Sequence, residues 1–293
     1  MRIAVTGHSG FIGAAAISHA ERRGHQLVRV LRPGARKITP ADRHADLADT
    51  ASLFEIASSV DAVLHCAASE DPAARNLSKD ALHALLNGLP PGGRFVMQGG
   101  SAVFGDTGPE PVKEPEFRPP PALASRAWLE QQVLQAKRHD VRSHIVYGSL
   151  IYGGARAAIP EAMIRAALNT GAAVYFGDGD QVWSTAHVDD FGRLLVDALE
   201  CDTHRSCKLF AAGHAILIRQ VSAILSCVLG VPSRPVANSQ EADAFGTFSE
   251  LLQINQHFCS ESERARFGWR PDYSDDAELL IRELAFHAAH FAL

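Results

Sequence analysis

Short apolar runs alternate with amphipathic stretches along the first half of the chain. Residues 2–6, 26–31, 62–68, 94–98 and 144–151 are apolar enough to form strands, and residues 11–23 and 126–139 have helical periodicity. Continuous apolar strands separated by helices are typical of parallel βαβ units whose sheet is covered on both faces. The pattern therefore predicts an α/β fold of the Rossmann type, with a doubly wound parallel sheet.

The pattern changes after Gly153 and Gly154, where a smaller α/β lobe is expected to begin. Helices are predicted over residues 157–168, 219–229 and 260–267, and a glycine-rich segment covers residues 171–180. Residues 188–200 and 208–212 are expected to return to the sheet. We therefore predict a dinucleotide-binding domain over residues 1–152 plus about 186–212, and a substrate-binding lobe over about 153–185 and 213–293.

A glycine-rich turn follows the first predicted strand directly, and it reads Thr-Gly-His-Ser-Gly-Phe-Ile-Gly over residues 6–13. Gly7 permits a tight turn, Gly10 lets the backbone approach a pyrophosphate, and Gly13 allows close packing of helix on strand. The helix that follows presents free N–H groups and a partial positive charge to phosphates. This arrangement indicates a dinucleotide site.

The turn and several later segments resemble the extended and atypical short-chain dehydrogenase/reductases, a family that includes NAD-dependent epimerases and dehydratases. The matching segments appear in the family's order: Asp46-Leu47, His65-Cys66-Ala67-Ala68, Val103-Phe104-Gly105-Asp106, Ile151-Tyr152-Gly153-Gly154, His187-Val188-Asp189-Asp190 and Phe267-Gly268-Trp269-Arg270-Pro271. The resemblance implies these cofactor-binding residues: Gly7, Ser9, Gly10, Phe11, Ile12, Gly13, Arg32, Asp46, Leu47, His65, Ala67, Ala68 and Arg126.

The end of the second strand bears on the choice of cofactor. An acidic residue there hydrogen-bonds the ribose 2′-hydroxyl of NAD, whereas an arginine accommodates the 2′-phosphate of NADP. Here Arg32 follows the strand without a carboxylate, and Arg36 and Lys37 lie nearby. We predict NADP(H) rather than NAD(H), while a merely solvated basic turn is the alternative.

The family's usual catalytic Tyr-x-x-x-Lys pair is missing, because none of the four tyrosines has a lysine four residues later. Alignment by resemblance places Arg126 on the lysine position and Ala122 on the tyrosine position. Gly100 falls on the usual hydroxyl position, with Ser101 one residue away. An arginine supplies a fixed cation and can bind a ribose, but it cannot deliver a proton.

Substitute catalytic groups are Tyr147, Tyr152 and Ser101, with Arg126 as the cation. Each tyrosine is a proton donor or a packing residue on this reasoning. His187 is either a packed polar residue or a contact of the substrate lobe, and Asp189 and Asp190 suit a helix N-terminus better than catalysis.

Three functions follow from this combination. The favoured one is an NADP(H)-dependent oxidoreductase that transfers a hydride to a carbonyl, imine or conjugated alkene of a small non-sugar substrate. The others are a non-redox cyclase, isomerase or lyase on the same scaffold, and a catalytically silent NADP(H)-sensing protein. A substrate of aromatic or alicyclic type is expected only if the lobe's aromatic residues face the cleft rather than its core. These residues are Tyr175, Phe176, Trp183, Phe245 and Phe248.

Composition narrows the partners. A formal net charge of −5 and a pI near 6.3 do not suggest a nucleic-acid partner. The five cysteines form no Cys-x-x-Cys pair, which indicates reduced thiols, a cytoplasmic location and no metal site. The sequence suggests neither a signal peptide nor a membrane partner. The resemblance also allows a homodimer through a helix pair that includes the one near Arg126.

Overall fold

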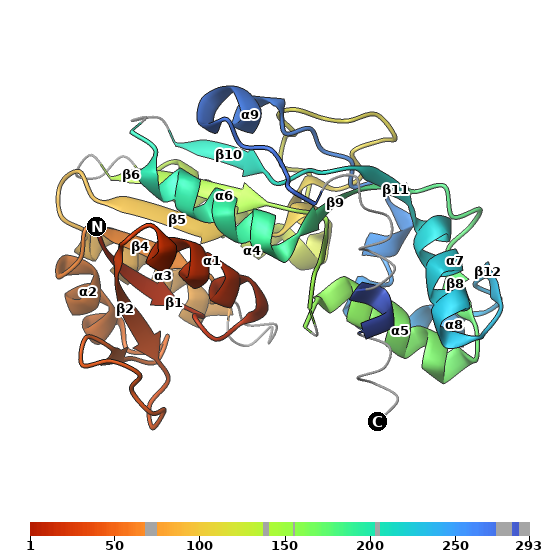
Figure 1. The fold of residues 1–293 in the computed structure, drawn as a ribbon, viewed down its shortest axis with the longest axis horizontal. Helices are drawn as coiled ribbons and strands as arrows, with labels where there is room; N and C mark the ends of the chain where they lie inside the picture. The colour runs from red at the N-terminus through yellow and green to blue at the C-terminus, as the bar shows by residue number, and fades with distance from the viewer. Residues whose placement is uncertain (68–74, 137–140, 155, 203–205, 274–282, 287–293) are drawn as a thin grey trace. The chain divides into compact units, whose positions relative to one another are not determined.

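The structure is a computed structural model that describes residues 1–293 except 68–74, 137–140, 155, 203–205, 274–282 and 287–293 (Figure 1). The chain divides into two units, which are described separately. The first unit comprises Met1–Gly99, Pro121–Tyr147 and Phe191–Leu209, and the second comprises Gly100–Pro120, Gly148–Asp190 and Phe210–Leu293. Gly100–Pro120, which the sequence assigned to the nucleotide domain, thus belongs to the second unit.

The first unit is built on a seven-stranded sheet with the order β10-β6-β5-β4-β1-β2-β3. The strands are β1 (Arg2–Thr6), β2 (Gln26–Leu31), β3 (Arg43–His44), β4 (Ala62–His65), β5 (Arg94–Gln98), β6 (Arg142–Tyr147) and β10 (Cys207–Phe210). The registers from β3 across to β6 are parallel throughout. The predicted Rossmann-type parallel sheet is therefore confirmed.

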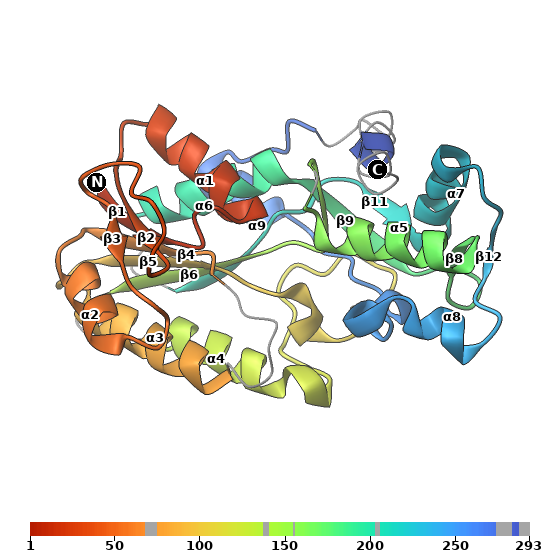
Figure 2. The same cartoon turned by 90° about the horizontal axis from the view of Figure 1, so that it is seen from below.

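Helices cover both faces of this sheet, as Figure 2 shows: α1 and α6 lie on one face, and α2, α3 and α4 on the other. Their bounds are α1 (Phe11–Arg22), α2 (Thr50–Ser58), α3 (Arg75–Gly88), α4 (Ala124–Leu134) and α6 (Val188–Glu200). Burial on both faces explains the continuous apolar strands. Ile3, Ala4, Val63, Leu64 and Val96, for example, have no exposed surface.

The strand order reverses between β1 and β4. The chain runs from β1 outward to β2 and β3, and then returns to place β4 on the other side of β1. Ligands of doubly wound sheets bind outside the carboxyl ends of the strands at such a point. The residues at the carboxyl ends of β1, β4, β5 and β6 are therefore the place to look for a site.

The second unit contains a three-stranded sheet of order β11-β9-β7 and a two-stranded sheet of β12 and β8. Its strands are β7 (Leu150–Tyr152), β8 (Ala173–Tyr175), β9 (Val182–His187), β11 (Ala215–Leu217) and β12 (Ser233–Pro235). Its helices are α5 (Ala158–Thr170), α7 (Ile218–Leu229), α8 (Ser239–Asp243) and α9 (Glu261–Phe267), and its short 3-10 turns include Ser101–Phe104, Gly246–Phe248 and Leu251–Gln253.

Several predicted elements have different bounds, and three of them differ most clearly. The predicted strand over residues 144–151 is two strands, because β6 ends at Tyr147 and β7 pairs with β9 in the second unit. The strand expected over residues 62–68 ends at His65. The helix expected from residue 126 begins at Ala124, directly after a 3-10 turn (Pro121–Leu123), and residues 137–139 of that prediction lie outside the described part of the chain.

Candidate functional site

The glycine-rich turn between β1 and α1 is shaped by close backbone contacts. Gly7 has a φ of 67°, and a Cβ on it would lie 2.6 Å from the backbone nitrogen of Ala67. A Cβ on Gly13 would overlap the carbonyl oxygen of Gly7. The Gly10 amide donates to the Gly7 carbonyl at 3.0 Å and closes the turn. Glycine is needed here for steric reasons, because backbone occupies the space of a side chain.

The start of α1 fits a dinucleotide pyrophosphate. The first N–H groups of a helix, here those of Phe11, Ile12 and Gly13, have no acceptor within the helix. Ser9 and Gly10 are exposed, so the approach to these donors is not covered by their own side chains. Backbone donors and the positive end of the helix dipole both favour a phosphate group at this position.

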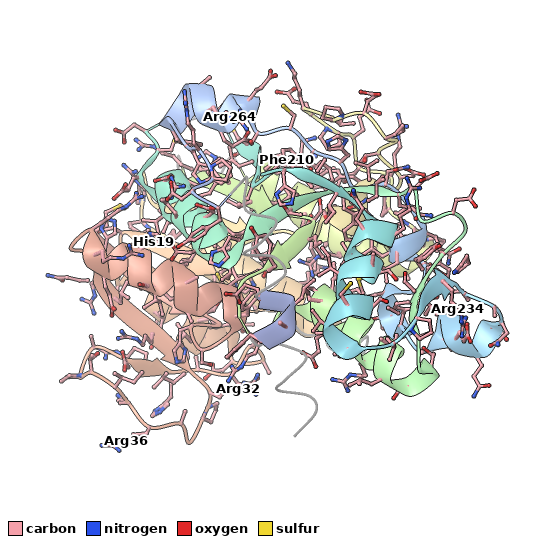
Figure 3. All side chains as sticks on the ribbon, turned by 45° about the vertical axis from the view of Figure 1, so that its right-hand side comes forward. His19, Arg32, Arg36, Phe210, Arg234 and Arg264 are labelled. Carbon is pink, nitrogen blue, oxygen red and sulfur yellow. The ribbon has the colours of Figure 1, made fainter. Side chains whose placement is uncertain are left out.

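The loop after β2 carries the residues predicted to read the ribose phosphate. Arg32 and Arg36 are exposed, and both are labelled in Figure 3. Asp42 is fully buried beneath this loop and accepts hydrogen bonds from the amides of Ile38 and Thr39 at 2.7 and 2.8 Å. These backbone bonds, together with Arg29 at 3.6 Å, hold the pKa of Asp42 at about 2 although burial opposes ionisation. The basic loop is thus anchored by a buried carboxylate.

Four further predicted cofactor residues, Asp46, Leu47, Ala67 and Ala68, follow β3 and β4 in the sequence. Asp46 is exposed and accepts a hydrogen bond from the Ala48 amide at 2.9 Å, while Leu47 is half-buried. Ala67 is half-buried and directly follows the backbone that contacts Gly7. Ala68 lies outside the described residues.

His65 ends β4 beside the end of β1. Its Nδ1 lies 2.8 Å from the Thr6 hydroxyl oxygen, and both side chains are buried. Burial, and next the positive charge of Arg126, lower the pKa of His65 to about 4. The imidazole is therefore neutral at physiological pH, and the Arg126 guanidinium lies close enough to act on it.

Arg126, Glu130 and Tyr147 form a cluster at the carboxyl end of β6. The Arg126 Nε donates to Glu130 Oε1 at 2.9 Å, and the Tyr147 hydroxyl donates to Glu130 Oε2 at 2.9 Å. Glu130 and Tyr147 have no exposed surface, whereas a third of the Arg126 side chain is exposed. Burial and the neighbouring carboxylate raise the pKa of Tyr147 well above its usual value. This phenol is a structural hydrogen-bond donor and a poor source of protons.

Two other predicted catalytic residues, Tyr152 and Ser101, lie in the second unit. The Tyr152 hydroxyl donates to the backbone carbonyl of Tyr273 at 3.0 Å, and the side chain is 1% exposed. Ser101 is buried and opens a 3-10 turn, so it is not part of a strand. These environments suit packing more than proton transfer.

His187 is packed between two aromatic rings. Its ring centroid lies 4.0 Å from that of Tyr273 and 5.4 Å from that of Tyr152. Asp190 is buried and accepts the amides of Asp272 and Tyr273 at 3.0 and 3.2 Å. The His-Val-Asp-Asp segment therefore holds Asp272 and Tyr273 in place.

The aromatic residues considered as a substrate lining belong to the core of the second unit. Trp183 has no exposed surface, and Phe245 and Phe176 are 3% and 8% exposed. Tyr175 and Phe248 are half-buried against the same core. They therefore lend no support to an aromatic or alicyclic substrate.

The sequence profile of the "NAD dependent epimerase/dehydratase family" matches residues 3–208, which hold the glycine turn, the basic loop and the α4–β6 cluster. The chain belongs to this family. Two relatives cover almost its whole length: Uncharacterized protein C2A9.02 of Schizosaccharomyces pombe is 27% identical (94% of this chain, 96% of the relative). Uncharacterized protein YLL056C of Saccharomyces cerevisiae is 25% identical (92% and 95%).

Solved structures of epimerases and dehydratases share the fold of this family member. DesIV, a dTDP-glucose 4,6-dehydratase from Streptomyces venezuelae with NAD and TYD bound, is 20% identical with a TM-score of 0.77 (100% of this chain, 98% of that one). PA4631, a nucleoside-diphosphate-sugar epimerase from Pseudomonas aeruginosa, is 17% identical with a TM-score of 0.76 (99% and 98%). At 20% identity or less, these likenesses show the shared fold.

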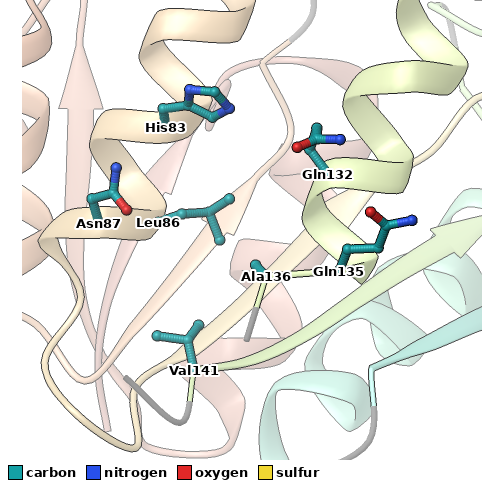
Figure 4. Close-up of a pocket in the computed structure, with 7 residues that line it drawn as sticks. All are labelled: His83, Leu86, Asn87, Gln132, Gln135, Ala136 and Val141. Atoms are coloured by element: carbon teal, nitrogen blue, oxygen red, sulfur yellow. The ribbon is translucent and has the colours of Figure 1, made fainter. Parts of the chain in front are cut away.

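A surface hollow of about 450 Å³ lies elsewhere on the first unit, between α3 and α4 (Figure 4). Its lining includes Asn87 near the end of α3, Gln135 just past α4 and Val141 just before β6. It therefore lies at the amino end of β6, opposite to the edge where ligands of such sheets bind. Within the described part of the chain, no cluster of metal-ligating side chains is present, and no helix is long and apolar enough to span a bilayer.

Sequence reasoning gave no role to Glu130, Asp42 and Thr6. The i,i+4 spacing of Arg126 and Glu130 on a predicted helix was a usable signal for their ion pair. Asp42 and Thr6 act through buried contacts with distant residues, for which the sequence has no local pattern.

Proposed function

We propose that this family member is an NADP(H)-dependent oxidoreductase that transfers a hydride to a carbonyl, imine or conjugated alkene of a small, non-sugar substrate. The proposal is carried by the glycine-rich turn after β1 together with the cluster around Arg126 on α4. In that cluster Arg126 is a partly exposed cation, whereas the phenol of Tyr147 is buried and bonded to the Glu130 carboxylate. When bound, the nicotinamide supplies or accepts the hydride, and the chain's own groups orient it.

The preference for NADP(H) is supported by the loop after β2. Arg32 follows the last residue of β2 and is exposed, with Arg36 and Lys37 also exposed on the same loop. A guanidinium pairs with a phosphate through two parallel hydrogen bonds. The Asp42 carboxylate is turned inward onto loop amides, so it is not offered to a ribose hydroxyl.

The choice of acceptor group is supported by the state of Tyr147. Its hydroxyl is bonded to Glu130 and its pKa is raised, so acid catalysis by this phenol is disfavoured. Iminium and enone substrates need less acid assistance than a simple ketone. A sugar nucleotide is disfavoured because residues 181–186, before the His-Val-Asp-Asp segment, contain no cation to hold a diphosphate.

The cofactor part of the proposal is tested with Arg32→Glu. The purified variant is titrated with NADPH and with NADH, and binding is followed by nicotinamide fluorescence. We expect NADPH affinity to fall at least tenfold while NADH affinity holds or rises. Arg264→Glu, which changes an exposed charge on α9 in the second unit, is the matched control and should leave both affinities unchanged. Equal losses in both variants would show a general charge effect and remove Arg32 from the site.

The reaction itself is tested by offering carbonyls, imines and conjugated alkenes together with NADPH. Consumption of NADPH in a one-to-one ratio with reduced product supports hydride transfer. Product formation without any change in nicotinamide absorbance would instead establish a non-redox reaction. Tight NADPH binding without turnover of any compound would favour the sensing role, for which the buried state of Tyr147 is the supporting observation.

A further inference from the structure

Glu130 is a buried carboxylate at the edge of the sheet where the dinucleotide is expected. Its two oxygens have different partners: Oε1 accepts from Arg126 on the same helix, and Oε2 accepts from Tyr147 at the end of β6. An ionised carboxylate without exposed surface is strongly disfavoured unless it is paired and hydrogen-bonded. The two bonds meet that requirement and tie α4 to β6 at one point.

The residue that follows the neighbouring strand β5 leaves space for the Tyr147 ring. Gly99 follows β5, its amide donates to the Val146 carbonyl at 2.8 Å, and a Cβ on it would overlap the Tyr147 ring. The ring lies where a side chain at residue 99 would otherwise be. The hydroxyl is thereby held against Glu130, with little freedom to turn toward another acceptor.

Arg126 is the partly exposed member of this cluster. Its bond to Glu130 uses Nε, and a third of its side chain is open to solvent. A guanidinium offers five N–H groups in a rigid planar fork, so a bond at Nε fixes the direction of the remaining donors. Nearby His65 is neutral, so it does not compete as a second cation.

We infer that Glu130 and Tyr147 are positioning residues that fix the Arg126 guanidinium as the cation facing the bound dinucleotide. The inference rests on the proposed function. Glu130 orients Arg126 through Oε1, and Tyr147 holds Glu130 through Oε2. In place of the family's Tyr-x-x-x-Lys pair, the cluster offers a fixed cation, Arg126, that is held by two buried residues, Glu130 and Tyr147.

A double-mutant cycle on NADPH affinity tests whether Glu130 acts through Arg126. Glu130→Gln, Arg126→Ala and the double variant are titrated with NADPH as intact full-length protein. We expect Glu130→Gln to weaken binding about tenfold when Arg126 is present, and less than twofold when Arg126 is already removed. Glu130→Asp keeps the carboxylate and should restore part of the lost affinity.

Two further variants keep the test decisive. Tyr147→Phe removes one hydroxyl, retains the ring over Gly99, and is expected to weaken binding about threefold, consistent with one lost hydrogen bond. If Glu130→Gln does not fold, the NADPH affinity of Tyr147→Phe decides whether the buried residues of the cluster act on NADPH binding. Glu161→Gln removes the partner of Arg165 in an i,i+4 pair on α5 of the second unit and should leave NADPH affinity unchanged.

The outcomes separate the two proposals. Wild-type protein that binds neither NADPH nor NADH would overturn the proposed function, and this inference with it. Normal wild-type binding with an equal loss from Glu130→Gln in both backgrounds would overturn the inference alone, because Glu130 would then act independently of Arg126. Unchanged affinity in both Glu130→Gln and Tyr147→Phe would do the same.

Discussion

The two units use similar residue types in different ways. In the first unit, His65 and Tyr147 lie at the carboxyl ends of parallel strands, and Arg126 on α4 remains partly open to solvent. In the second unit, Tyr152 and His187 bond or pack onto the segment around Tyr273. The comparison teaches that a tyrosine or histidine within a family motif is not by itself a catalytic group. The hydrogen-bond partners of such a side chain are more informative about its role than its place in the motif.

The largest effect is expected from Gly13→Val, which tests whether the first unit depends on backbone contact at the turn. The new side chain would overlap the Gly7 carbonyl, so we expect a loss of about 3 kcal/mol in the free energy of unfolding. NADPH binding should become undetectable. Thermal melts and titrations are the measurements, and Ala14→Val at the exposed neighbouring position is the control. Wild-type-like behaviour of Gly13→Val would contradict the close turn.

The free energy of unfolding at acidic pH should depend on His65. Its pKa is about 4 in the folded state against 6.5 ordinarily, so between these pH values the unfolded chain binds a proton that the folded chain does not. The contribution of neutral His65 is fully present above pH 6.5 and is lost as pH falls toward 4, by about 3 kcal/mol. His65→Asn should flatten this part of the pH–stability curve measured by urea unfolding. A curve for His65→Asn that stays as steep as the wild-type curve between pH 6.5 and 4 would refute the assignment.

Arg126→Ala should destabilise the protein by about 2 kcal/mol, because it leaves the Glu130 carboxylate buried without its cation. The expected loss is smaller than that for a fully buried ion pair, because Arg126 is partly exposed. The double variant Arg126→Ala with Glu130→Gln should recover most of the loss in the same unfolding experiment. A double variant less stable than Arg126→Ala would show that the charges are not coupled in this way.

The smallest effect is expected from Tyr152→Phe, which sharpens the contrast with the second unit. Loss of the hydroxyl that bonds the Tyr273 carbonyl should cost about 1 kcal/mol and leave NADPH affinity unchanged. Urea unfolding measures the change in stability, and titration with NADPH measures the affinity. If turnover of a substrate identified by the screen were abolished while stability stayed intact, Tyr152 would be catalytic after all.

The fold and the glycine-rich turn after β1 were predictable because their signals are local in the sequence. The positive φ of Gly7 and the contact of Gly13 with the Gly7 carbonyl arise within a few residues of one another, and the apolar strands follow from burial on both faces. The Arg126–Glu130 pair is four residues apart on one helix. In contrast, Tyr147 meets Glu130 across 17 residues and Tyr152 meets Tyr273 across 121, so only tertiary packing brings them together. The split of the predicted strand at Tyr147 has the same origin, because the next strand pairs in another sheet.

The most direct test of the account is a titration of the purified wild-type protein with NADPH and NADH at the same ionic strength, followed by nicotinamide fluorescence and tryptophan quenching. The account predicts saturable NADPH binding that is clearly tighter than NADH binding, as expected for Arg32 at a 2′-phosphate. Equal affinity for the two would contradict the assigned preference. Absence of binding to either would contradict the central claim that the turn between β1 and α1 holds a dinucleotide.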